Sequence, residues 1–136
     1  MRRVLQQAGL SDAVVCDSAG TSGAHRGSLP DARIIDAGRR RGLPMTGSAR
    51  QVTRADLDRF DLILAMDDDN YTGLRRLATP GNQYKIKRFC EYCVAHADSE
   101  VPDPYYGGAD GFEYVLDLME DGCTEILRQI SSDRDA

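Results

Sequence analysis

Asp103 lies in a stretch that combines side chains suited to acid–base chemistry on a planar substrate. Pro102 and Pro104 flank it, and each proline disfavours the α-helical region for the residue before it, so the Asp103 carboxylate is expected to stand on a stiff, extended loop. Tyr105 and Tyr106 follow directly. A fixed carboxylate beside aromatic rings is suited to act as a general acid towards an aromatic substrate. The structural alternative is a Pro/Gly turn whose tyrosine rings cover the edge of the core.

The elements that must position this loop alternate between strand and helix. An apolar run over 60–66 predicts an interior parallel strand, with Asp67 at its carboxyl end as the cap of the next helix. A second apolar run over 13–16 predicts a buried strand, followed by a loop of small residues that contains Ser18. In parallel sheets, ligands bind beyond the carboxyl ends of the strands, so these separate stretches are expected to converge on one site.

Apolar periodicity and capping residues predict the remaining elements. They are helices over 1–8, 31–41 and 53–59, a partly exposed strand over 84–89 and a long helix from about 110 to 130. Gly9 and Gly42 are placed to end the first two helices. Thr53 and Asp56 resemble a capping box. The chain therefore belongs to the α/β class, with a parallel sheet in a single domain over 1–136.

Composition excludes several classes of partner. The 136 residues carry a formal net charge of -5, and 41% of them are hydrophobic, which is typical of one globular domain with a sizeable core. The basic cluster at 39–41 fits the charged end of a helix, so we expect no nucleic-acid partner. No run is long enough for a signal peptide or a membrane span, so we expect no membrane partner. The four cysteines fit reduced thiols, and we expect a cytoplasmic location.

Four motifs, in this order and spacing, resemble the low-molecular-weight protein tyrosine phosphatases. They are Asp17-Ser-Ala-Gly-Thr21, Ala49-Arg-Gln-Val-Thr53, Phe60-Asp-Leu-Ile-Leu-Ala-Met-Asp67 and Asp103-Pro-Tyr-Tyr-Gly-Gly108. The fourth motif is highly specific, whereas the first is shared with related phosphatases and arsenate reductases. The resemblance covers essentially the whole chain. It implies a three-layer α/β fold in which helices flank a four-stranded parallel sheet, with the first strand missing here.

The resemblance also implies a function. The protein would hydrolyse phosphotyrosine, in a protein or a small aryl phosphate, through a cysteinyl-phosphate intermediate. Asp103 would protonate the departing phenolic oxygen and then accept a proton from water. Tyr105 and Tyr106 would contact the substrate, and Ser18 and Asp67 would support the phosphate-binding loop. No metal or organic cofactor is implied.

The nucleophile of that family is not found in the sequence. The family uses a Cys-x5-Arg loop, in which backbone N–H groups and the arginine hold the phosphate. The residues six places after the four cysteines are Ser22, His96, Ser99 and Gln129. We therefore expect that Met1 is an internal methionine of a longer reading frame, and that the chain alone is inactive and marginally stable. The family often has an aromatic residue where Ala24 stands, so one wall of the cleft is expected to be lower and substrate preference to differ. It can have a histidine where Gly47 stands, so one brace of the phosphate-binding loop is expected to be absent.

Other functions remain open from the residues alone. A catalytically inactive relative would keep the cleft and bind a partner, and an arsenate reductase-like protein would share the loop of small residues. Cys90 and Cys93 form a Cys-x-x-Cys pair that suits redox chemistry. With His96 they could form part of a metal site, although a structural zinc needs a fourth ligand and none stands nearby in the sequence.

Overall fold

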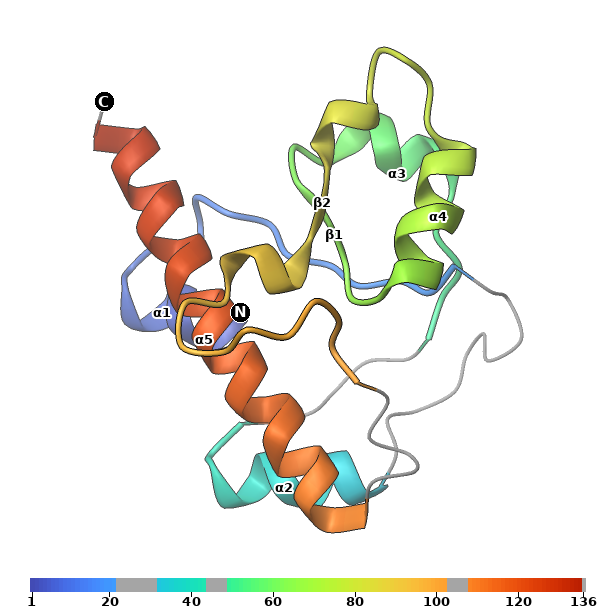
Figure 1. Cartoon of the computed structure of the whole chain (residues 1–136). Coiled ribbons are helices and arrows are strands. Elements are labelled where there is room, and N and C mark those ends of the chain that lie inside the picture. The colour runs from blue at the N-terminus through green and yellow to red at the C-terminus, as the bar shows by residue number, and fades with distance from the viewer. Residues whose placement is uncertain (22–31, 44–48, 103–107, 136) are drawn as a thin grey trace.

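The computed structural model describes residues 1–21, 32–43, 49–102 and 108–135 (Figure 1). Its elements, in chain order, are α1 (Arg2–Gln7), α2 (Ala32–Arg40), α3 (Arg54–Arg59), β1 (Ile63–Ala65), α4 (Asp68–Leu77), η1 (Gln83–Lys85), β2 (Ile86–Arg88), η2 (Phe89–Tyr92) and α5 (Gly108–Asp135). The η elements are short 3₁₀ helices. Within these described parts, no helix combines the length and apolarity needed to cross a membrane.

The sheet in the described residues is parallel, as predicted. β1 pairs with β2, with Ile63 opposite Ile86, and α4 lies in the connection between the two strands. A further parallel bridge joins Gly20 to Gln51. In this bridge, Gly20 N–H donates to the Arg50 carbonyl and Val52 N–H donates to the Gly20 carbonyl, both at 2.8 Å. The α/β class predicted from the sequence is confirmed.

Alternating side chains of β1 face two different layers of helix. Ile63 and Ala65 pack with Leu57 of α3 and Leu74 of α4. Leu64 packs into the cluster that contains Phe89 and residues of α5. Figure 1 shows the same arrangement, with α3 and α4 on one side of the strands and α5 on the other. The strands therefore form the middle of three layers.

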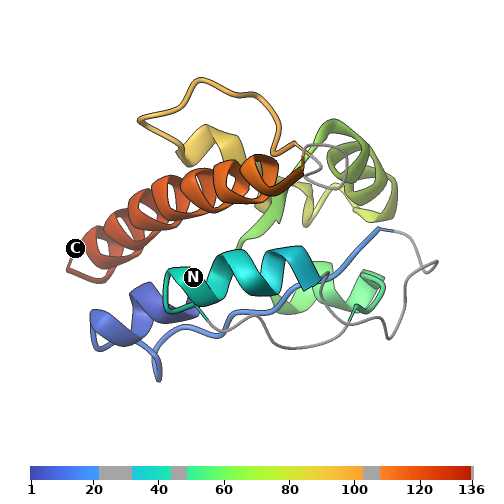
Figure 2. The same ribbon diagram turned by 90° about the horizontal axis from the view of Figure 1, so that it is seen from below.

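α5 is the longest element and forms most of the helical layer on the side of the strands opposite α3 and α4. Its residues Cys123 and Ile126 pack with Phe89, and Phe112 and Leu116 pack with Ala37 of α2. Figure 2 shows α2 running alongside the N-terminal half of α5. The apolar periodicity that predicted this helix is therefore that of a face buried in the core.

Local signals place most of the element ends correctly. Gly9 and Gly42 follow α1 and α2 with φ values of 72° and 69°, in the left-handed region that glycine adopts without strain. Thr53 and Asp56 form the predicted capping box at the start of α3. The strand predicted over 84–89 shortens to three residues between two 3₁₀ helices, because the turn after α4 continues to Lys85.

The strand predicted over 13–16 is wrong. This segment is a turn followed by irregular backbone, and Val15 is 72% exposed. The carbonyl of Cys16 accepts a hydrogen bond from the Arg2 side chain at 3.0 Å, in place of a bond from a neighbouring strand. An apolar run becomes a strand only where a partner strand takes up its backbone groups, and among the described residues none pairs with this run.

Candidate functional site

The carboxyl end of β1 is the point at which the predicted site residues were expected to meet. Asp67 follows the strand and caps α4, because its Oδ1 accepts the Asn70 N–H at 2.7 Å. The carboxylate is therefore held by the first turn of the helix, as predicted from its position. Asp68, the next residue, forms an ion pair with Arg88 at the end of β2. The Arg88 guanidinium also lies 4.3 Å from the centre of the Tyr71 ring.

Residues 100–101 are hydrogen-bonded to this same corner of the fold. Val101 N–H donates to the Met66 carbonyl at 2.7 Å. Asp68 N–H donates to Glu100 Oε1 at 2.6 Å, so the Glu100 carboxylate satisfies a free N–H at the start of α4. Val101 also packs against the cluster around Phe89. The chain that leads into Asp103 is thus fixed at the end of β1 two residues before it.

The loop that carries Ser18 is attached to the same helix from another direction. Asn70 Nδ2 donates to Thr21 Oγ1 at 3.4 Å, and a Cβ at Gly73 would lie 3.3 Å from Thr21 Cβ. Ser18 N–H donates to Asp17 Oδ1 at 2.8 Å. The segment 17–21 therefore runs past the first half of α4, whose cap is Asp67.

Arg50 connects this loop to the core. Its Nη2 donates to Asp17 Oδ2 at 3.1 Å, and its two terminal nitrogens donate to both oxygens of Asp56 at 2.9 and 3.2 Å. Asp56 is only 9% exposed and also accepts the Thr53 N–H at 2.8 Å. Hydrogen bonds from Arg50, which outweigh the opposing effect of burial, lower the pKa of the Asp56 carboxyl to about 2.

The predicted site residues fall into two groups. Ser18 and Asp67 are described, and both belong to segments that contact the first half of α4. Asp103, Tyr105 and Tyr106 lie outside the described residues, as do Ala24 and Gly47. The hydrogen bonds of Glu100 and Val101 hold the chain at the end of β1, just before the segment that contains Asp103.

Sequence reasoning missed Arg50 and Glu100 as supporting residues. The signal for Arg50 was present, because it lies within one of the four motifs, but no partner could be named for it. Glu100 lies 32 positions from the N–H that it binds. Neither periodicity nor capping rules can find a contact between residues so far apart in the sequence.

The cysteines are free, and burial raises the pKa of three of them, Cys90, Cys93 and Cys123. For Cys93 the value is about 11. Such thiols are protonated at neutral pH and are poor nucleophiles. This agrees with the expectation that none of them is the nucleophile.

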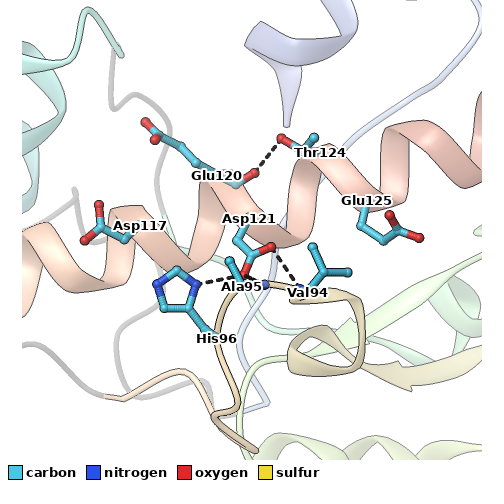
Figure 3. Close-up of a pocket in the computed structure, with 8 residues that line it drawn as sticks. All are labelled: Val94, Ala95, His96, Asp117, Glu120, Asp121, Thr124 and Glu125. Carbon is cyan, nitrogen blue, oxygen red and sulfur yellow. Dashed lines mark hydrogen bonds and ion pairs between the residues drawn. The ribbon is translucent and has the colours of Figure 1, made fainter.

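The proposed metal site at Cys90, Cys93 and His96 does not form. In the described ranges, no group of three metal-ligating side chains comes together, and His96 Nδ1 instead pairs with Asp121 at 2.7 Å. A hollow of about 430 Å³ lies beside this pair, and Figure 3 shows that the Asp121 carboxylate, in its lining, points directly at His96 and at the backbone of residues 94–95. The described lining residues include neither Ser18 nor Asp67, so this hollow is separate from the predicted site.

Comparison with known proteins assigns the whole chain to one group of relatives. A family model described as low molecular weight phosphotyrosine protein phosphatase matches residues 1–136. A Synechocystis sp. protein named for this phosphatase class is 47% identical over 98% of this chain and 85% of its own length. The low molecular weight protein-tyrosine-phosphatase YfkJ of Bacillus subtilis is 39% identical over the same shares.

Solved structures agree with these sequence matches. The crystal structure of a protein tyrosine phosphatase from Entamoeba histolytica, with Hepes in its active site, superposes with a TM-score of 0.95. It is 36% identical, and the match covers 98% of this chain and 85% of that one. The crystal structure of YfkJ superposes with a TM-score of 0.88. The arrangement of layers described above is thus the arrangement found in these phosphatases.

Proposed function

The chain belongs to the low molecular weight phosphotyrosine protein phosphatase family, and from this premise we propose that it works as a phosphotyrosine phosphatase with Asp103 as general acid and base. The substrate is a phosphotyrosine-containing protein or a small aryl phosphate. Residues 1–136 form one phosphatase-like domain in this proposal. The free thiols are consistent with a cytoplasmic location.

The reaction has two chemical steps in which Asp103 changes its protonation state. In the first step, a cysteine thiolate attacks phosphorus, the bond from phosphorus to the phenolic oxygen breaks, and Asp103 donates its proton to that oxygen. In the second step, water attacks the phosphocysteine, and Asp103 accepts a proton from the water as the thiolate leaves. Tyr105 and Tyr106 contact the aromatic ring of the substrate. Ser18 and Asp67 support the phosphate-binding loop.

The observation that carries the proposal is the double anchor of residues 100–101 at the carboxyl end of β1. Ligands of parallel sheets bind at this edge, and the loop with the general acid begins two residues later. The 17–21 loop, tied to α4 by Thr21, supports the same location. Three stretches far apart in the sequence thus contribute to one corner of the fold.

The cysteines of residues 1–136 do not fit the role of this thiolate. No cysteine here is followed by arginine six positions later. Burial raises the pKa of Cys90, Cys93 and Cys123, the opposite of what a phosphate-binding loop does to its cysteine. The test of the proposal therefore uses the native gene product, with its N-terminal sequence established by mass measurement.

The experiment compares the native gene product with Asp103→Asn on two esters, phenyl phosphate and p-nitrophenyl phosphate. Loss of the proton donor should lower kcat for phenyl phosphate by roughly 10²–10⁴-fold, because phenolate is a poor leaving group. The loss should be much smaller for p-nitrophenyl phosphate, and inhibition by inorganic phosphate should hardly change. Ser99→Ala is the matched control in the same segment.

Two results would contradict the proposal. Equal losses on both esters would remove Asp103 from the role of proton donor. A native product that binds aryl phosphates without hydrolysing them would replace the phosphatase by a binding protein.

A further inference from the structure

Cys90 and Cys93 lie in contact at the end of a short 3₁₀ helix. η2 contains Cys90, and Cys93 is the residue that ends it, with its N–H donating to the Cys90 carbonyl at 3.2 Å. Cys90 is buried, with 8% of its surface exposed, whereas Cys93 is partly exposed. Cys93 is therefore the more exposed of the two residues.

The backbone between the two cysteines has the dimensions that a disulfide needs. A turn closed by a hydrogen bond from residue i+3 to residue i keeps the two Cα atoms within about 7 Å. Disulfides span Cα separations of about 4.4–6.8 Å. The 3.2 Å backbone hydrogen bond from Cys93 to Cys90 closes such a turn, so a disulfide fits the backbone of η2 as it stands.

The surroundings of the pair favour the protonated form of both thiols. Cys93 Sγ donates to the Leu118 carbonyl of α5 at 3.6 Å, which holds the thiol in its protonated form. Burial and the nearby Asp121 carboxylate raise the pKa of Cys93. Thiolate is therefore scarce at neutral pH, and reaction with small disulfides is slow but not blocked.

We propose that Cys90 and Cys93 are a reversible disulfide site that exchanges with small disulfides such as oxidised glutathione. The thiolate of Cys93, the more exposed residue, attacks one sulfur of oxidised glutathione, and one glutathione leaves as a thiolate that takes up the Cys93 proton. Cys90 then attacks Cys93 Sγ in the mixed disulfide and releases the second glutathione. The two protein thiols are oxidised, and one oxidised glutathione is reduced to two molecules of glutathione.

This site is independent of the phosphatase chemistry. Formation of the disulfide would change one contact between η2 and α5. The disulfide has no S–H group, so the hydrogen bond to the Leu118 carbonyl is lost when it forms. The Asp121 carboxylate still holds the backbone of Val94 and Ala95 directly after the pair. The change is therefore expected to stay local to η2 and the facing turn of α5.

The test incubates the folded chain with oxidised glutathione at pH 8, stops exchange with acid, alkylates the remaining thiols and maps the peptides by mass. A Cys90–Cys93 disulfide within one peptide is expected, and reduced glutathione should reverse it. In Cys90→Ser, glutathione should remain bound to Cys93. In Cys93→Ser, Cys90 should be modified at least about tenfold more slowly, because it is buried. Cys16→Ser is the control and should leave the disulfide yield unchanged.

Results that overturn the proposal are separate glutathione adducts on both cysteines, or equal modification rates of the two single variants in the folded state. Circular dichroism confirms that each variant is folded, and in urea the two rates should become equal. The time course in the unmutated chain provides a readout that needs no variant. A mixed disulfide at Cys93 should precede the internal disulfide, and an adduct that appears first at Cys90 would contradict the order of attack.

Discussion

The ring of Phe89 lies against the backbone of Gly122 so closely that no side chain fits between them. A Cβ at Gly122 would lie 2.3 Å from Phe89 Cζ and 2.6 Å from Cε1. The ring is 2% exposed and belongs to the cluster with Cys123 and Ile126, so it has no free space to enter. This contact joins η2, directly after β2, to the long helix α5.

Gly122→Ala should therefore destabilise the fold, although alanine favours helix. Overpacking costs about 1–3 kcal/mol, while the gain in helix propensity is about 1 kcal/mol. Urea unfolding at pH 7 measures the difference. Gly81→Ala is the control, because the nearest atom there is Thr79 Oγ1 at 3.7 Å in an exposed loop. In the Gly122→Ala background, Phe89→Leu should cost less than it does alone, and strictly additive losses would refute the packing explanation.

The pair of Arg50 and Asp56 should make stability depend on pH in the acid range. The pKa of Asp56 is lowered from 3.8 to about 2 in the folded chain, so the charged carboxylate stabilises the fold above about pH 4. This contribution, on the order of 1–2 kcal/mol, is lost as the pH falls from about 4 to 2. Asp56→Asn should be less stable than the unmutated chain at pH 7 and nearly as stable at pH 2. An unchanged difference between pH 7 and pH 2 would show that the charge is not responsible.

Glu100→Ala should release the first N–H of α4. The Asp68 N–H loses its 2.6 Å acceptor, so its hydrogen exchange should rise about tenfold. Glu100→Gln keeps an oxygen acceptor and should recover much of the protection, whereas Ser99→Ala should have no effect. The comparison is made by amide exchange resolved at residues 66–70. An Asp68 amide that stays protected in Glu100→Ala would mean that the side chain does not anchor this segment.

Replacement of Asp121 should destabilise the fold more than replacement of Glu120, its neighbour on α5. Its side chain is 6% exposed and accepts the N–H groups of Val94 and Ala95 at 2.9 and 3.0 Å, besides pairing with His96. Burial alone would raise the pKa of Asp121, but these hydrogen bonds outweigh it and lower the pKa. Asp121→Ala should cost about 2–3 kcal/mol in thermal or urea unfolding. Glu120→Ala, which removes an exposed ion pair with Arg41, should cost less than about 1 kcal/mol.

Features set by neighbours in the sequence were the most predictable. The caps at Thr53 and Asp67 are bonds between residues three positions apart, and the glycines after α1 and α2 act through their own backbone. α5 was found from its apolar period, but Leu118, which is fully buried, lies off the stripe formed by Phe112, Leu116, Cys123 and Ile126. The segment 93–96 covers α5 from another side, so the buried surface is wider than one stripe.

Contacts between distant residues could not be predicted. Arg50 binds Asp17, which lies 33 positions away, and no pattern in the sequence paired these two residues. The apolar run at 13–16 was expected to be a strand because such runs are commonly buried, but an apolar pattern does not specify the partner that a strand requires. Asp103 was singled out by its two prolines, and its role remains a prediction of the family resemblance.

The corner between β1 and α4 hydrogen-bonds residues 100–101 through two of its main-chain groups, the carbonyl of Met66 and the N–H of Asp68. Neither hydrogen bond depends on the side chain at position 66 or 68, so substitutions there should preserve both bonds. The exception is proline at position 68, which has no N–H to donate. Glu100 has no such latitude, since its own carboxylate makes the bond. Saturation mutagenesis should therefore find that many substitutions are tolerated at Met66 and few at Glu100.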